Sequence, residues 1–382
     1  MAVIAGAGVA VIYVPQPIQT LVADEFGVDG AGAAWATIAV QAGYALGIGL
    51  LVALGDRVST RRQATVQIVA TAAALGVAAA APGYAVYTAM MLVAGATASV
   101  AQLLVGAALR LAPPTARART AAVLLGSIIV GLFAVRTGLG ALAEALGWRG
   151  ALAVCAVLVL ALVPLSLRAA PADRPSDPPA YGRILASIPR VAASSPTLRI
   201  MTSIHTTTFM AFIALWSMTT VHAVDELGLR IGEAALIGIA GLVGGAITIG
   251  AASVHGRIGA RRSLAACMAL AVGGVAIATA GSGSPLVMAV GLLMVSAGMS
   301  SEQVSTQAIG LASVAPEQNG RANTVFMGST FLGGSIATAV ASVLLPLGGF
   351  VAVGAFAFAL AVTAASLAVI ANRRGMLGAA GR

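Results

Sequence analysis

The chain has 382 residues, of which 59% are hydrophobic and only 9% are charged, and its formal net charge is +9. Soluble domains carry about 25% charged residues, so this composition excludes a cytosolic enzyme, a nucleic-acid-binding protein and a disordered scaffold. All 21 basic residues are arginine, and in a membrane protein such residues mainly mark the loops that stay inside the cell. The positive charge therefore indicates membrane topology and not an acidic partner.

Twelve apolar stretches are each long enough to cross a bilayer, which takes about 20 mostly apolar residues. They lie near residues 3–22, 33–54, 63–81, 85–109, 120–142, 150–167, 199–221, 233–254, 263–281, 286–309, 321–344 and 350–371. Charged residues or Gly and Pro turn signals separate them, and none shows the alternating polarity of a membrane β-strand. We therefore predict an all-α membrane protein with twelve transmembrane helices.

The distribution of arginine predicts the orientation of these helices. If both termini are cytoplasmic, 18 of the 21 arginines fall in inside segments and seven of the 12 acidic residues fall outside. Cytoplasmic loops carry the excess of Arg and Lys, so we expect both termini in the cytoplasm of a bacterial cell and a multi-pass protein of its cytoplasmic membrane. The apolar N-terminus lacks the basic region of a secretory signal and is interpreted as a retained helix.

A polar, Pro-rich interval divides the twelve stretches into six and six. We predict an N-terminal bundle over 1–167, a cytoplasmic linker over 168–198 with a short helix near 181–193, and a C-terminal bundle with a short tail over 199–382. The halves also repeat: Arg57, Arg61 and Arg62 recur as Arg257, Arg261 and Arg262, while Pro114, Arg119 and Trp148 match Pro316, Arg321 and Phe350. Two parallel six-helix repeats are typical of transporters with a site near the membrane midplane.

The loop between the second and third stretches, Leu54-Gly55-Asp56-Arg57 followed by Arg61-Arg62, resembles the signature loop of the major facilitator superfamily. A degenerate copy with Gly256 in place of the acid lies between the eighth and ninth stretches. Three further segments, Tyr13-Val14-Pro15-Gln16-Pro17, Gly43-Tyr44-Ala45-Leu46-Gly47 and Gly147-Trp148-Arg149, resemble a bacterial efflux-type branch of that superfamily, similar to drug:proton antiporters. The fifth stretch lacks the Gly-Pro pair of the antiporter motif, which departs from that branch.

The resemblance covers the whole chain and implies two pseudo-symmetric six-helix bundles. It also implies that Asp56, Arg57, Arg61 and Arg62 form a latch that holds the inward side closed. Arg257, Arg261 and Arg262 would form a weaker copy, because their loop lacks the acid. The alternative for Arg61 and Arg62 is that they are ordinary inside-facing arginines.

Two charged residues lie within the predicted membrane stretches. Glu302 is the only carboxylate there, and a charge in mid-membrane costs at least about 2.5 kcal/mol unless it faces a cavity or a partner. We interpret it as a proton or cationic-substrate site; the alternative is a neutral structural glutamate or one near the cytoplasmic mouth. Arg136 in the fifth stretch could clamp a carboxylate, or could extend to the outer interface or pair with Glu144.

A set of uncharged polar residues is predicted to line a substrate cavity, because the first, fourth, seventh and tenth helices line the central path in this fold. The set comprises Gln16, Gln19, Gln41, Gln102, His205, Gln303 and Gln307, and Trp216 is a further candidate for substrate contact. Such residues also join membrane helices by hydrogen bonds worth about 0.6 kcal/mol each, so purely structural roles are the alternative. Trp35 and Trp148 are interpreted as membrane-interface anchors.

The leading interpretation is a secondary active transporter that works by alternating access and exports a small organic molecule by proton antiport. The alternatives are a proton-coupled importer of a small carboxylate and a sensor without transport activity. No GxxxxGK[ST] loop occurs, so the energy should come from an ion gradient. Cys155, Cys267 and the three histidines form no metal-ligand cluster; we expect no cofactor, no metal and no enzymatic activity. The expected partners are a small-molecule substrate, protons and lipid, with no nucleic acid, and we expect a monomer.

Overall fold

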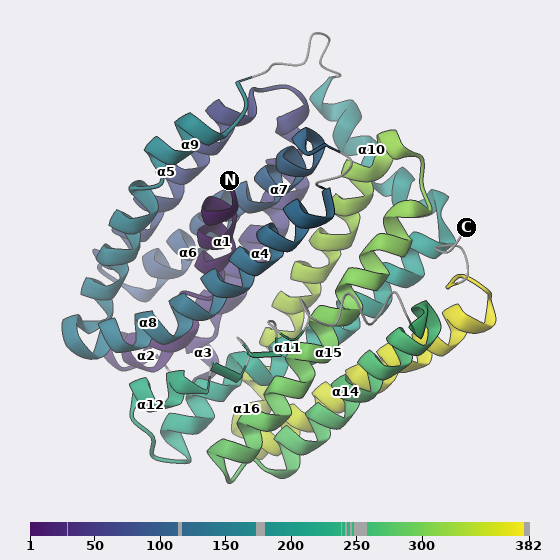
Figure 1. Ribbon diagram of the computed structural model, residues 1–382. Helices are drawn as coiled ribbons and strands as arrows, with labels where there is room; N and C mark the ends of the chain where they lie inside the picture. The colour runs from purple at the N-terminus through teal and green to yellow at the C-terminus, as the bar shows by residue number, and fades with distance from the viewer. Residues whose placement is uncertain are drawn as a thin grey trace. The chain divides into compact units, whose positions relative to one another are not determined.

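The computed structural model describes residues 1–28, 30–113, 117–172, 180–237, 239–240, 243–244, 247 and 258–377. These residues form α-helices and short 3-10 helices, and no β-strand occurs among them. The chain divides into two compact units, Met1–Ala186 and Ser187–Arg382, which are described separately (Figure 1). The all-helical class predicted from the sequence is confirmed.

The first unit is built from helices that pack along one another as a bundle. Its elements are α1 (Ala2–Val11), η1 (Gln16–Ile18), α2 (Gln19–Phe26), α3 (Gly30–Ala33), α4 (Trp35–Leu50), η2 (Val52–Asp56), α5 (Thr60–Ala79), α6 (Tyr84–Ala98), α7 (Val100–Leu111), α8 (Arg117–Leu160) and α9 (Val163–Ala169). Helix α1 packs on α7 and α8, α4 on α6, and α5 on α6, α8 and α9; Figure 1 shows α5 beside α9. Helix α10 (Tyr181–Ser194), expected near 181–193, spans the boundary between the units.

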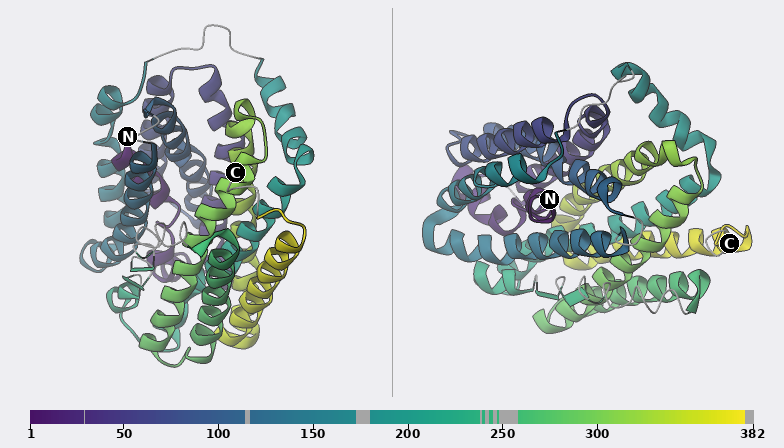
Figure 2. Two further views of the ribbon diagram at one scale, coloured as in Figure 1. Left: turned by 45° about the vertical axis from the view of Figure 1, so that its right-hand side comes forward. Right: turned by 45° about the horizontal axis from the view of Figure 1, so that its top comes forward.

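The described residues of the second unit form both long and short helices. They are α11 (Pro196–Asp225), α12 (Ile231–Leu236), α14 (Ala260–Ala280), α15 (Pro285–Ala312), η4 (Pro316–Gln318) and α16 (Asn319–Arg373). Helix α11 packs along α16 and α15, and α14 packs on α15 and α16. Figure 2 shows the yellow C-terminal arm of α16 beside the green helices of this unit.

Among the described residues, seven helical segments are long and apolar enough to cross a membrane, and the bent pair Ala2–Val11 and Gln16–Phe26 makes eight. Two helices continue through a break. Helix α8 is interrupted at Gly147, and the 55-residue α16 at Gly348 and Gly349. A 55-residue helix would be about 80 Å long against a hydrocarbon core of about 30 Å, so the two arms of α16 cannot form one crossing. The predicted stretch 233–254 lies largely outside the described residues, and the count of twelve stays a prediction.

Two predicted stretches are broken where continuous helices were expected. The stretch 3–22 bends by 40° between α1 and the η1–α2 segment, where Pro15 and Pro17 have no N–H to donate to a helical hydrogen bond. The backbone there uses tighter i→i−3 bonds, as in Ile12 N–H to the Val9 carbonyl (3.1 Å). The stretch 85–109 divides at Ser99 into α6 and α7.

Glycines let pairs of helices approach at matched places in the two units. A Cβ atom on Gly43 of α4 would collide with the Leu92 carbonyl of α6, and one on Gly244 would lie 2.8 Å from the Leu293 carbonyl of α15. Gly244 and Leu293 follow Gly43 and Leu92, respectively, by 201 positions. Small residues commonly allow such close contacts between membrane helices, so the internal repeat extends from sequence to helix packing.

Candidate functional site

The interior of the second unit holds a histidine–glutamate pair. His205 of α11 and Glu302 of α15 are 97 residues apart, yet His205 Nδ1 lies 2.7 Å from Glu302 Oε1. The side chains are only 1% and 0% exposed, respectively. Both residues were predicted site candidates on separate helices, and the packing of α11 on α15 brings them together.

Neighbouring side chains hold this pair in place. The hydroxyl of Thr306 lies 2.9 Å from the backbone carbonyl of Glu302 and 3.1 Å from the other carboxylate oxygen, Glu302 Oε2, and its single hydrogen is shared between them. The ring of Phe326 on α16 stacks on His205, with centroids 5.0 Å apart and planes 5° apart. The stack orients the plane of the imidazole, and the hydroxyl lies beside the carboxylate.

The short Nδ1–Oε1 contact requires one hydrogen between the two atoms, because two bare acceptors would repel. With one proton shared between an imidazolium and a carboxylate, or between an imidazole and a carboxylic acid, the pair has no net charge. A neutral imidazole with its hydrogen on Nδ1 makes the same contact with a carboxylate, and the pair then has a net charge of −1. In both states one hydrogen lies between Nδ1 and Oε1.

An aromatic stripe continues from the pair along α11. Phe209 meets Phe331 of α16 edge-on at 5.3 Å, and Phe212 stacks on Trp216 at 5.1 Å. Trp216, a predicted substrate contact, is fully buried. The contact of Phe209 with Phe331 packs α11 on α16, whereas Phe212 and Trp216 both lie on α11.

The predicted glutamines of α15 make contacts with α16. Gln307 Nε2 donates to Asn323 Oδ1 at 2.7 Å, and Gln303 Nε2 donates to the sulfur of Met327 at 3.8 Å. Both glutamines are half-buried. They are consistent with the alternative of polar groups that join helices.

The predicted polar residues of the first unit are buried. Gln16 and Gln41 are 0% exposed, and Gln19 is 3% exposed. Among the described residues, neither amide atom of Gln19 has a hydrogen-bond partner. Gln102 Nε2 donates to the hydroxyl of Tyr44 at 3.3 Å. A buried amide without a partner is unfavourable by about 1–3 kcal/mol.

The predicted gating loop connects two helices of the first unit. The guanidinium Nε of Arg61 donates to the Ala170 carbonyl (3.0 Å), and its backbone N–H donates to the Pro171 carbonyl (2.9 Å), just beyond the end of α9. Arg57, Arg62, Arg261 and Arg262 are exposed. The side chains of Asp56 and Arg136 and the whole of Arg257 lie outside the described part of the structure.

Two residues that contact the His205–Glu302 pair, Thr306 and Phe326, were not predicted from the sequence. Thr306 follows Glu302 by four positions, which on a helix places both on one face, so that signal was present. Phe326 has no such local signal, because its contact with His205 depends on how α16 packs against α11.

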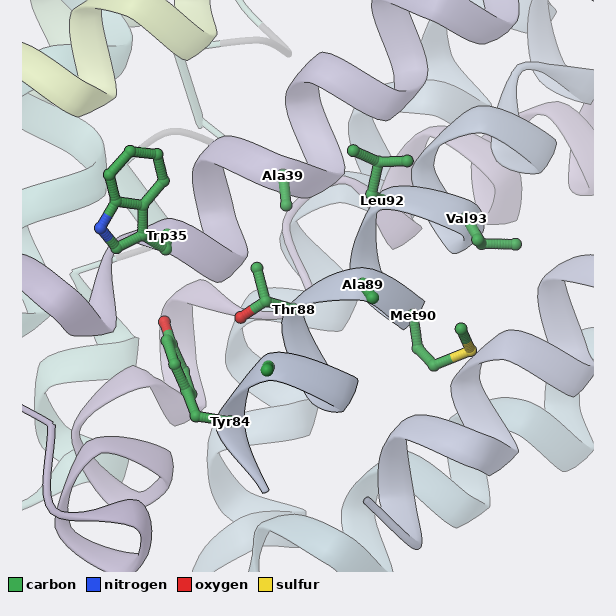
Figure 3. Close-up of a pocket in the computed structure, with 9 residues that line it drawn as sticks. Trp35, Ala39, Tyr84, Thr88, Ala89, Met90, Leu92 and Val93 are labelled. Atoms are coloured by element: carbon green, nitrogen blue, oxygen red, sulfur yellow. The ribbon is translucent and has the colours of Figure 1, made fainter. Parts of the chain in front are cut away.

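An apolar groove lies elsewhere, between α4 and α6 of the first unit (Figure 3). It has a volume of about 590 Å³ and is lined by Trp35, Ala39, Tyr84, Ala85, Thr88, Ala89, Met90, Leu92 and Val93. None of the predicted substrate-contact residues lines it. The Tyr84 hydroxyl at its edge shares its single hydrogen between the backbone carbonyls of Gly32 (2.7 Å) and Ala33 (2.9 Å), so this hydroxyl is engaged within the protein.

Comparison with known proteins connects this fold to a transporter family. The sequence profile of the Major Facilitator Superfamily matches residues 1–338. A Streptomyces coelicolor protein named "Probable transporter" is 28% identical over 332 residues, which is 86% of this chain and 77% of that protein. The "Uncharacterized transporter YgaY" of Escherichia coli O157:H7 is 30% identical over 238 residues, 62% of this chain and 60% of that protein.

Solved structures share the fold at low sequence identity. A bacterial homolog of the human lysosomal transporter Spinster, in an inward-facing and occupied conformation, has a TM-score of 0.74 at 11% identity and covers 97% of this chain and 95% of that chain. The human organic anion transporter TETRAN has a TM-score of 0.69 at 15% identity, over 96% of this chain and 97% of that chain.

Proposed function

This chain belongs to the Major Facilitator Superfamily, and on that premise we propose that it exports a small organic molecule in exchange for protons by alternating access. It is a membrane transport protein and not an enzyme, in keeping with its family and its transporter relatives. The proposal includes twelve transmembrane helices, two six-helix bundles over 1–167 and 199–382 joined by the linker 168–198, and a monomer. It places both termini in the cytoplasm and the protein in a bacterial cytoplasmic membrane.

The His205–Glu302 pair is the observation that carries the proton coupling. Its 2.7 Å contact joins two titratable groups in a site that is almost inaccessible to solvent. Such buried ionisable residues in membrane helices commonly belong to proton relays. A transporter that binds a proton here in one conformation and releases it in another would couple the gradient to substrate export.

The substrate would be bound by the uncharged polar groups of the helices. The unpartnered amide of Gln19 offers a donor and an acceptor, and Gln16, Gln41, Gln102, Gln303, Gln307 and Trp216 complete the proposed set. Arg136 is a further candidate, for a substrate that carries a carboxylate. Neutral polar residues favour recognition by hydrogen bonds over recognition by charge.

The loop with Asp56, Arg57, Arg61 and Arg62 would serve as the gate, with the copy at Arg257, Arg261 and Arg262 as a weaker counterpart. The two bonds from Arg61 to the chain beyond α9 support this proposal. They tie the start of α5 to the end of another helix, so that these helices move together when the transporter changes conformation.

Flux measurements in proteoliposomes test the proposal. A panel of small organic cations, anions and neutral molecules is loaded, and flux is measured with and without an imposed pH gradient. We expect a gradient to drive export by the native protein, and Glu302→Gln to abolish that dependence. Glu317→Gln, the same change at an exposed position of η4, is the matched control and should leave coupling intact. Unaltered coupling in Glu302→Gln would refute the proton role.

A further inference from the structure

One end of the first unit is held by a clamp around Arg149. Its guanidinium donates to Glu25 Oε1 from Nε and Nη2 (2.9 and 2.8 Å), and to the carbonyls of Ala79 (2.8 Å) and Ala81 (2.9 Å) at the end of α5. It also stacks over the ring of Trp148 at 4.4 Å, and the indole N–H of Trp148 donates to Glu25 Oε2. A cation, a carboxylate and an aromatic ring thus secure the C-terminal end of a helix.

The second unit has a clamp of the same composition at the matching place. His222 Nε2 lies 2.8 Å from the Ser282 carbonyl, just beyond the end of α14. The imidazole stacks on Phe350 at 4.6 Å, and its Nδ1 lies 3.5 Å from Glu226 Oε2. Phe350 is the residue that matches Trp148 in the internal repeat, and α14 is the counterpart of α5.

The two clamps differ in their cation. The guanidinium of Arg149 is always charged, whereas the imidazole of His222 is charged only when both nitrogens carry a hydrogen. A carbonyl oxygen can only accept, so the contact with Ser282 requires a hydrogen on Nε2. In the neutral ring Nδ1 is then a bare acceptor that faces a carboxylate.

The Nδ1 atom of His222 is buried and has no hydrogen-bond partner among the described residues. His222 is 4% exposed, and in the described structure no donor reaches its Nδ1. A proton on Nδ1 would make this contact an ion pair with Glu226, whose side chain is 54% exposed. The same proton creates a cation over the face of Phe350.

We propose that His222 and Glu226 form a second proton-binding site, and that a bound proton tightens the contact between α11 and the C-terminal end of α14. His222 lies 17 residues from His205 on α11, about 25 Å along the helix, so the two sites are distinct. With the proposed topology this site lies at the outer face of the membrane. It would respond to the pH outside the cell, whether or not the His205–Glu302 pair couples transport to protons.

Among the described residues, few other charges lie near this site. Residues 277–287, from the end of α14 to the start of α15, and residues 345–355 of α16 contain no charged residue. On α11 itself Asp225 precedes Glu226. On the α12 side, Arg230 is paired with Glu233 at 3.5 Å. Glu226 is therefore the carboxylate that the geometry assigns to Nδ1.

Nitrogen-15 NMR of histidine-labelled protein in detergent tests the proton site directly. The chain has only three histidines, and His222→Gln identifies the relevant signal by its disappearance. We expect the neutral ring to carry its hydrogen on Nε2. We also expect a larger doubly protonated fraction in the native protein than in Glu226→Gln throughout pH 5.5–7.5. Equal fractions in the two proteins, or a neutral ring protonated on Nδ1, would overturn the proposal.

Amide hydrogen exchange tests the mechanical consequence with a matched control in the other unit. After correction for the intrinsic effect of pH, exchange at residues 277–282 should increase about threefold between pH 6 and pH 8, as expected for loss of a partly exposed ion pair. Residues 77–81 in the Arg149 clamp should show no such increase. His222→Arg should remove the pH effect and Arg149→His should create one in the first unit; a pH effect that persists in His222→Arg would disprove the clamp.

Discussion

Gly147 and Gly349 lie 202 residues apart and adopt almost the same backbone conformation, with φ of 71° and 62° and ψ of 164° and −165°. This conformation is essentially restricted to glycine. Each residue directly precedes the aromatic ring of a clamp, Trp148 in the first unit and Phe350 in the second. The two halves therefore share the sharp break that separates consecutive helical arms.

Alanine at these two breaks should destabilise the protein. The cost of a non-glycine residue in this backbone region is about 1–3 kcal/mol. In the described part of the structure no atom lies within 4 Å of a Cβ built on Gly147, so the effect there would arise from the backbone alone. Thermal unfolding in detergent measures it. Gly138→Ala within α8, where a Cβ also meets no atom, should be neutral or slightly stabilising.

Removal of either His205 or Glu302 should destabilise the protein. His205→Leu or Glu302→Met leaves one buried group without its partner, which destabilises proteins by about 3–5 kcal/mol. The double variant removes both groups and should be less destabilised than the sum of the single variants, by about 0.5–3 kcal/mol. Thermal unfolding of the native protein, the two single variants and the double variant gives this double-mutant cycle.

A hydrogen bond between two uncharged side chains provides the comparison for that double-mutant cycle. Gln307→Leu breaks the 2.7 Å bond to Asn323, and we expect a loss of about 1 kcal/mol. Strictly additive effects of His205→Leu and Glu302→Met would show that the two side chains do not act as a pair.

Arg61→Ala should weaken the attachment of α5 to the end of α9. The change removes the bond from Nε to the Ala170 carbonyl and a cation near a helix C-terminus, an interaction worth about 0.3–1 kcal/mol. Hydrogen exchange at residues 166–171 should increase. Arg62→Ala is the matched control, because Arg62 is exposed, and a similar increase in that variant would contradict a specific role for Arg61.

The contacts of Glu25 with Arg149 and Trp148 should be lost only at acidic pH. Hydrogen bonds from Arg149 and then from Trp148 lower the pKa of Glu25 from its ordinary value of 4.5. A carboxylate with a lowered pKa in the folded state contributes stability above the ordinary value, and loses it as the pH falls through the lowered value.

Trp148 fluorescence, in a Trp35→Phe, Trp216→Phe background, follows this loss. We expect a constant signal from pH 8 to pH 5 and a change only at more acidic pH. In Arg149→Ala the change should shift to higher pH, because the largest cause of the lowered pKa is gone; an unshifted transition would argue against the assignment.

Much of the helical architecture could be predicted from hydropathy, because a helix that crosses lipid must be apolar along its length. The breaks within these helices were harder to predict. Pro15 and Pro17 lie within an apolar stretch that still has the length of a span, and Ser99 divides α6 from α7 without any proline or charge nearby. Hydropathy measures the environment of a segment and not its backbone path.

The candidate site could be predicted residue by residue but not as an arrangement. Glu302 stands out because it is a carboxylate within an apolar stretch, and His205 because it is polar in another. Their contact depends on the rotation of α11 against α15, which is determined by packing over the whole interface. The same holds for Phe326, whose ring fixes the imidazole plane.

The break in the first stretch also determines which way its amides face. In an uninterrupted α-helix, side chains three positions apart are rotated by about 60° from one another, whereas in a 3-10 helix they eclipse. Gln16 opens η1 and Gln19 follows it directly, so the tighter winding brings the two side chains nearer to a single row than an α-helix would. Replacing Pro15 and Pro17 with residues that restore an α-helix would turn one amide away from the other, and the chain would lose a paired set of donors and acceptors without losing either glutamine.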